Sequence, residues 1–208
     1  MSGGVAEVKR NLIVDLGGVL TGLDRRRCIE AFTAIGAEDV AGYVDECRQE
    51  DLFHDLEVGL TGVGEFCDAV RCACKCCTAA DEDICRAWNA LLTGIPTSRL
   101  DMLLRLKRSH RLVLLSNTNP IHWHKAETCF FTAGGLTVGD YFEEVFLSYR
   151  MHLLKPGEEI FRRVLDATGF ALGDTLFIDD SQANRATAEG LGMAVAPGLE
   201  ALPGLGYM

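Results

Sequence analysis

Polar side chains suited to acid, base and metal chemistry stand at the ends of short apolar runs. Asp15 closes the first run and Ser116 a later one. The pair Asp179 and Asp180 closes another, and Lys155 follows a further run after a loop. If these runs are parallel strands, the five side chains meet at the sheet edge where ligands bind. Three carboxylates at close range repel one another unless a divalent cation lies among them.

The nature of that cation follows from the ligands. Hard oxygen ligands with few protein contacts suit Mg²⁺, which keeps waters and a substrate phosphate around it. The lysine and the serine would then hold the remaining phosphate oxygens. The chain has 20 basic and 30 acidic residues, a net charge of −10, so its own field repels anions. A phosphorylated substrate would therefore need such a local cation.

We predict that these apolar runs are strands whose two faces are both buried. They are apolar without alternation, which is typical of a parallel sheet. Helical patterns lie between them at residues 98–109, 158–168 and 182–189. This alternation predicts a doubly wound α/β sheet. The expected strands are residues 11–16, 111–115, 144–147, 175–178 and 193–196.

A region without strands interrupts this alternation and indicates an inserted helical bundle. We therefore expect residues 1–21 and 96–208 to form a Rossmann-like α/β core with a five-stranded parallel sheet and the first strand near its centre. Residues 22–95 would form a helical cap that closes over the site and excludes water. The helices expected in the cap are residues 26–36, 39–54, 63–76 and 81–93.

The composition of the chain indicates where the protein is located and which classes of partner it disfavours. A chain this acidic is a poor candidate for binding nucleic acid, and no apolar run approaches the roughly 18 residues that span a membrane. The nine cysteines are odd in number, and four crowd between Cys72 and Cys77, without a secretory signal before them. Reduced thiols in a cytoplasmic protein fit this pattern. We interpret the cluster as small apolar cap residues, with zinc binding as the alternative.

Four short motifs stand in a fixed order along the chain. They are Asp-Leu-Gly-Gly-Val at 15–19, Leu-Leu-Ser-Asn at 114–117, Lys155-Pro156, and Phe-Ile-Asp-Asp-Ser at 177–181. Together they resemble the motifs of the haloacid-dehalogenase superfamily of phosphatases, which inserts a helical cap in the long first gap. Residues 148–161 resemble a segment of its sugar-phosphatase members. Residues 115–119 and the first motif resemble some phosphatases that act on glucose 1-phosphate.

The resemblance implies a role for each matched residue. Asp15 would be the nucleophile, attacking phosphorus and forming a phosphoaspartyl enzyme. Ser116, the backbone of Asn117 and Gly18 would bind phosphate oxygens. Lys155 would bridge the phosphate and the Asp15 carboxylate.

The implied magnesium site uses the first and fourth motifs. The Asp15 carboxylate, the Gly17 carbonyl and the Asp180 side chain would hold Mg²⁺, with Asp179 as an additional acid. The sequence departs from the family at Gly17, where a second aspartate usually protonates the leaving oxygen. Loss of a general acid typically costs about 10² to 10⁴ in rate.

Three interpretations of Gly17 stay open. The substrate could have a leaving group that needs little protonation, such as the anomeric hydroxyl of a sugar. Another group, Asp24 or the cap residue His54, could supply the proton. Alternatively, the protein is slow or inactive and only binds a phosphorylated ligand.

Specificity is expected to lie in the cap. His54 and Glu57 precede a turn at residues 59–62 that could face the active site and contact the substrate, with a solvated position as the alternative. His122 and His124 are expected near the start of a surface helix.

These features favour a Mg²⁺-dependent phosphatase for a small phosphorylated metabolite, in the first place a sugar phosphate. We expect it to act as a monomer or weak homodimer without nucleic-acid or membrane partners. The alternative is a non-catalytic or very slow regulatory protein that binds a phosphate ligand, which Gly17 suggests. Carbon–halogen hydrolysis is disfavoured because it needs no metal, and phosphomutase activity is disfavoured because it relies on the missing aspartate.

Overall fold

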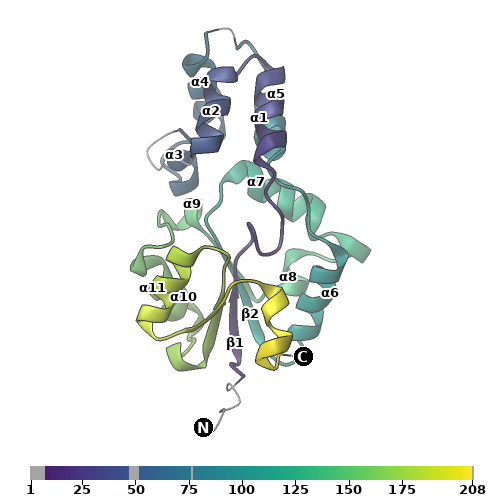
Figure 1. Ribbon diagram of the computed structural model, residues 1–208, viewed down its shortest axis with the longest axis vertical. Coiled ribbons are helices and arrows are strands. Elements are labelled where there is room, and N and C mark those ends of the chain that lie inside the picture. Colours follow the sequence, from purple (N-terminus) through teal and green to yellow (C-terminus); the bar gives the residue numbers. More distant parts are fainter. Residues whose placement is uncertain (1–7, 47–51, 76, 208) are drawn as a thin grey trace.

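The centre of the fold is a five-stranded parallel sheet. In the computed structural model, which describes residues 8–46, 52–75 and 77–207, the strand order is β3-β2-β1-β4-β5. This order confirms the predicted α/β core and places the first strand at the centre (Figure 1). The strands are β1 Asn11–Val14, β2 Arg111–Ser116, β3 Glu144–Leu147, β4 Thr175–Ile178 and β5 Ala194–Ala196.

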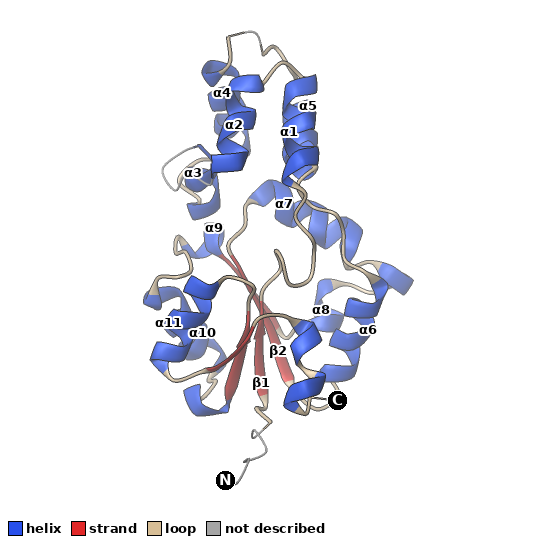
Figure 2. Ribbon diagram, viewed as in Figure 1, coloured by secondary structure: helices blue, strands red, loops and turns tan. Residues whose placement is uncertain are grey.

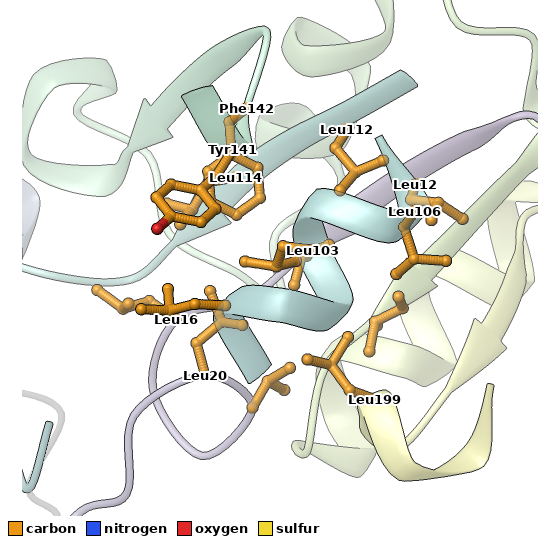
Figure 3. Close-up of a cluster of buried hydrophobic side chains, with 14 of the residues drawn as sticks. Leu12, Leu16, Leu20, Leu103, Leu106, Leu112, Leu114, Tyr141, Phe142 and Leu199 are labelled. Atoms are coloured by element: carbon orange, nitrogen blue, oxygen red, sulfur yellow. The ribbon is translucent and has the colours of Figure 1, made fainter. Parts of the chain in front are cut away.

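Both faces of the sheet are covered by helices. Successive strand residues point to opposite faces, so Leu12 and Val14 join one hydrophobic cluster and Ile13 joins another. Figure 3 shows the first cluster, in which Leu103 and Leu106 of α6 (Thr97–Leu106) lie over the strands. The second cluster contains the apolar stripes of α10 (Glu158–Thr168) and α11 (Gln182–Leu191). Helices α10 and α11 lie on one side of the sheet and α6 lies on the other (Figure 2).

Short helices complete the core. At the carboxyl end of β2, α7 (Pro120–Lys125) continues into a π-helix at Ala126–Phe130. At the carboxyl end of β3, α9 (Ser148–Met151) begins directly. The remaining elements are α8 Val138–Tyr141 and four 3₁₀ turns at Ala133–Gly135, Leu172–Asp174, Leu199–Ala201 and Pro203–Leu205.

The cap stands above the carboxyl ends of the strands, and its regular elements among the described residues are helices joined by loops (Figure 1). Of the helix expected at 39–54, the structure describes α2 up to Glu46 and α3 from Leu52, while residues 47–51 lie outside the described part of the chain. The precise domain boundaries stay a prediction. The cap helices are α1 Arg25–Ala34, α2 Glu38–Glu46, α3 Leu52–Val58, α4 Val63–Ala73 and α5 Asp81–Asn89.

A separate hydrophobic cluster holds the cap together. Rings from three of its helices meet, with the Phe53 ring centroid 4.2 Å from that of Trp88 and 5.6 Å from that of Phe66. Cys74 and Cys77 are buried in this cluster, whereas Cys72 is exposed; Cys76 lies outside the described residues. The two buried thiols therefore pack as small apolar side chains.

Among residues 8–46, 52–75 and 77–207, no helix has both the length and the apolar composition to cross a bilayer.

Candidate active site

Asp15 is the central acid of the site. It follows the last residue of β1, its amide donates to the Ile178 carbonyl at 2.9 Å, and it is 7% exposed. Burial raises the pKa of Asp15 to about 6; Lys155 opposes this rise, and the charge of Asp179 adds to it. A further cation beside the carboxylate would favour its ionised form.

Lys155 joins two of the acids. Its buried ammonium donates to Asp15 Oδ1 at 2.8 Å, to Asp179 Oδ2 at 2.7 Å and to the Leu115 carbonyl at 3.0 Å. Burial of the ammonium acts to lower its pKa, but the two carboxylates outweigh this and hold the pKa of Lys155 above its usual value. All three of its protons thus have acceptors, and the amine is fixed against Asp15.

Residues at the N-terminus of α11 fix the Asp179 carboxylate by hydrogen bonds. The Ser181 amide donates to Asp179 Oδ1 at 2.8 Å, and the Asn184 side-chain amide lies 3.1 and 3.0 Å from the two carboxylate oxygens. Arg185 donates to the Asp179 carbonyl at 2.6 Å. Asp179 is fully buried, and its carboxylate contacts the Lys155 ammonium. Sequence reasoning missed Asn184; its place in the first turn of the helix after the fourth motif was the available signal.

Asp180 is the exposed acid of the group. Oxygens of Asp15, Asp179 and Asp180 all lie within 4.8 Å of one another, close enough to share one metal ion. Gly18 makes room for this arrangement, because its φ is 76° and a Cβ at that position would lie 2.2 Å from an Asp180 oxygen. Gly18 therefore keeps the Asp180 carboxylate close to the backbone of the first motif.

The second motif supports the lysine as well as ending β2. The Asn117 side chain donates to the Lys155 carbonyl at 2.8 Å and accepts from the Lys155 amide at 2.9 Å. Its amide group is thereby committed to the lysine loop, which leaves the Asn117 backbone for a phosphate. Ser116 is buried at the end of the strand, one residue before this anchor.

Gly17 leaves space where an acid usually stands. A Cβ there would meet only the Leu23 side chain, at an ordinary contact distance of 3.6 Å, and the backbone is outside the left-handed region. Leu23 is 47% exposed. Asp24, one candidate proton donor, instead accepts from the Arg27 amide at 3.0 Å and caps α1.

The cap residues singled out from the sequence lie in α3. This helix packs against α9 at the carboxyl end of β3, and His54 Nδ1 lies 3.4 Å from Asp55 Oδ1. The Glu57 carbonyl lies 2.7 Å from Ser148 Oγ in the core. Contact of the His54 and Glu57 side chains with a substrate stays a prediction.

The expectation of a surface position for His122 is wrong. The ring is buried, stacks on Trp88 of the cap with centroids 4.5 Å apart, and its Nε2 donates to the Trp88 carbonyl at 3.0 Å. Burial lowers the pKa of His122 to about 4. His124 is exposed, as expected. His122 thus belongs to the joint between cap and core.

Known proteins share this sequence and architecture. The sequence profile of the haloacid dehalogenase-like hydrolases matches residues 9–192. The D-ribitol-5-phosphate phosphatase of Bacteroides thetaiotaomicron is 31% identical over 175 residues, 84% of each chain. A HAD family enzyme of the same organism, in complex with magnesium and inorganic phosphate, is 40% identical with a TM-score of 0.86, covering 91% of this chain and 93% of that one. A predicted HAD-like hydrolase from Porphyromonas gingivalis is 34% identical, with a TM-score of 0.86 and coverage of 96% and 97%.

Proposed function

The chain belongs to the haloacid dehalogenase-like hydrolase family, and we propose that it is a Mg²⁺-dependent phosphatase that releases inorganic phosphate from a small phosphorylated metabolite. The substrate class we favour is the phosphate ester of a sugar or sugar alcohol. The relative named for D-ribitol-5-phosphate and the relative in complex with phosphate support this class.

The observation that carries the proposal is the hydrogen-bonded series from Asp15 through Lys155 to Asp179. Lys155 holds one Asp15 oxygen at 2.8 Å, which orients the carboxylate at the end of β1. An oxygen of Asp15 attacks phosphorus, the bond from phosphorus to the ester oxygen breaks, and an aspartyl phosphate forms. Water then hydrolyses the aspartyl phosphate, which returns the Asp15 carboxylate and releases phosphate.

The acids at the sheet edge fit a magnesium ion. Three carboxylates within 4.8 Å of one another face a single lysine, so the group carries excess negative charge that a divalent cation would neutralise. Asp15, Asp180 and the Gly17 carbonyl would hold the ion, with Asp179 behind them. A bound Mg²⁺ would supply positive charge that neutralises the phosphate oxygens. Ser116 and the Asn117 and Gly18 backbones would bind the other oxygens, and Lys155 would join them by exchanging one of its three present acceptors for a phosphate oxygen.

The departing oxygen has no carboxylic acid at position 17 to protonate it. Asp24 is engaged as a helix cap, so of the two proposed donors His54 is the better candidate. Without a donor, the enzyme would favour esters of acidic hydroxyls, such as anomeric sugar phosphates. A phosphate on a primary alcohol, as in the named substrate of the ribitol phosphate relative, would instead require a donor from the cap.

A second candidate function rests on the same glycine. A protein that holds a phosphate at this edge and lacks the acid could bind a phosphorylated ligand for regulation, with little or no turnover. Binding and turnover therefore have to be measured on the same preparation.

A phosphatase screen separates the two functions. The purified protein is assayed for phosphate release from phosphorylated sugars, sugar alcohols and an aryl phosphate, with Mg²⁺ and with an excess of chelator. We expect turnover that stops when the metal is removed. Turnover unaffected by the chelator would refute the metal requirement, and phosphate binding without turnover of any ester would favour the regulatory function.

A further inference from the structure

A buried serine contacts both the cap and the loop that follows Ser116. Ser148 is the first residue of α9, and its side chain is fully buried. The Thr118 amide donates to its Oγ at 2.9 Å, and the Thr118 carbonyl lies 2.9 Å from the same atom. The Glu57 carbonyl of α3 in the cap lies closer, at 2.7 Å. One hydroxyl therefore links the cap to the loop that follows the second motif.

That hydroxyl has one proton for two carbonyl acceptors. Donation to Glu57 holds the end of α3 and leaves Thr118 attached to the serine through its amide alone. Donation to Thr118 ties down both the amide and the carbonyl of that residue but leaves the Glu57 carbonyl without the proton. The Glu57 carbonyl of the cap and the Thr118 carbonyl of the loop thus compete for the same proton.

A second residue of the core binds the same end of α3. His152 Nδ1 donates to the Val58 carbonyl at 3.0 Å. The next residue, Gly59, has a φ of 77°, and a Cβ there would lie 2.2 Å from the Tyr149 carbonyl. The final carbonyls of a helix have no partners within it, and here the core supplies donors to two of them. Among the described residues, His152 donates to α3 but makes no hydrogen bond to Thr118. It is therefore a matched comparison for Ser148.

We propose that Ser148 is a positioning residue that couples docking of the cap to the geometry of the phosphate-binding loop at 116–119. This proposal rests on the proposed function, because that function assigns the loop to phosphate. Since one hydroxyl serves both sites, a ligand that orders the loop changes the stability of cap docking, and docking changes ligand affinity by the same factor.

Hydrogen exchange on two alanine variants separates this coupling from a merely structural role. In the ligand-free protein, Ser148→Ala removes a bond from α3 and another from Thr118, so exchange should rise about fivefold or more in peptides from both segments. His152→Ala should raise exchange in α3 alone. If the two variants affect the peptide that contains Thr118 equally, Ser148 does not hold this loop and the proposal is wrong.

Inorganic phosphate with Mg²⁺ is the probe for the coupling itself. In the wild type and in His152→Ala, bound phosphate should speed exchange in α3, because an ordered loop draws the Ser148 proton to Thr118 and away from the Glu57 carbonyl. In Ser148→Ala, phosphate should still bind, measured by calorimetry, but should no longer change exchange in α3, and kcat/KM should fall about tenfold further than in His152→Ala. Ser148→Cys, which keeps a weaker donor, should give intermediate values and replaces the alanine variant if that fails to fold.

A failure of the proposed function and a failure of the coupling give different results. A wild type that binds no phosphate and hydrolyses no ester would overturn the proposed function. A wild type that binds phosphate while exchange in α3 stays unchanged or slows, or a Ser148→Ala variant in which phosphate still speeds that exchange, would overturn the coupling alone.

Discussion

The sheet edge and the cap are built from opposite kinds of side chain. At the edge, buried charges hold one another: Lys155 lies between Asp15 and Asp179, and Asn184 fixes Asp179 from α11. The cap interior instead packs aromatic rings and thiols, such as Phe53 and Cys74. Removing one partner of a buried ion pair leaves an uncompensated charge, whereas an apolar core accepts substitutions that conserve volume. The difference indicates that substitutions are tolerated less at the sheet edge than in the cap interior.

The largest effect should come from Asp15→Asn. Asparagine keeps the shape of the side chain but is no anionic nucleophile, so turnover should fall at least about 10³-fold. Steady-state assays at saturating Mg²⁺ measure the loss. Asp24→Asn is the matched control, since asparagine also caps helices well, and it should retain nearly full activity. If Asp24→Asn were the more damaging change, the roles of the two acids would have to be exchanged.

Gly17→Asp tests how much the missing acid costs. The space beside Leu23 admits a side chain without left-handed strain, so the variant should fold. In the wild type, kcat/KM should depend steeply on the pKa of the leaving group. The new acid should flatten this dependence and help poor leaving groups by up to about 10².

The slope of log kcat/KM against leaving-group pKa decides this point, with folding and Mg²⁺ affinity checked alongside. A shallow slope in the wild type would mean that another residue already donates the proton, and His54→Gln would be the next variant to assay.

The two adjacent aspartates should differ in metal binding. Asp180 is exposed beside Gly18, whereas Asp179 already accepts hydrogen bonds from Lys155, Ser181 and Asn184. Asp180→Asn should therefore weaken Mg²⁺ binding about tenfold or more, and Asp179→Asn less, although it should lower the stability of the protein. Calorimetric titration with Mg²⁺ gives the order; a reversed order would contradict our assignment of the metal ligands.

The joint between cap and core should respond to acid through His122. Burial lowers the pKa of its folded-state imidazole to about 4, against about 6.5 in an unfolded chain. The unfolded state therefore binds more protons between these values, so stability is complete above about pH 6.5 and decreases as pH falls toward 4. The protonation of His122 in the unfolded state lowers the free energy of unfolding by about 2 kcal/mol between pH 7 and pH 5.

Denaturant unfolding at several pH values measures that slope. His122→Phe, which keeps a ring on Trp88, should reduce the slope in this window, and His124→Phe at the exposed neighbouring position should not. Comparing variants cancels the opposite trend from Asp15, whose raised pKa favours the folded state at lower pH. Equal slopes in both variants would show that His122 does not titrate with unfolding.

Sequence patterns located the strands and the acids at their ends because both are local features. The strands are apolar runs, and Asp15 and Asp179 directly follow two of them, β1 and β4. The patterns could not show that the Asn117 side chain binds the Lys155 backbone, since that contact joins separate loops. The burial of His122 was equally hidden, because Trp88 reaches it from the cap, 34 positions earlier in the chain. Local periodicity carries no information about such contacts between distant segments.

The central claim is that Asp15 forms a covalent bond to the transferred phosphate. A reacting sample can be quenched in acid within milliseconds, and borohydride then reduces an acyl phosphate to an alcohol that peptide mass spectrometry locates. The account predicts homoserine at position 15 during turnover and none in Asp15→Asn. Modification at Asp179 or Asp180, or an unmodified position 15 while phosphate is released, would contradict it.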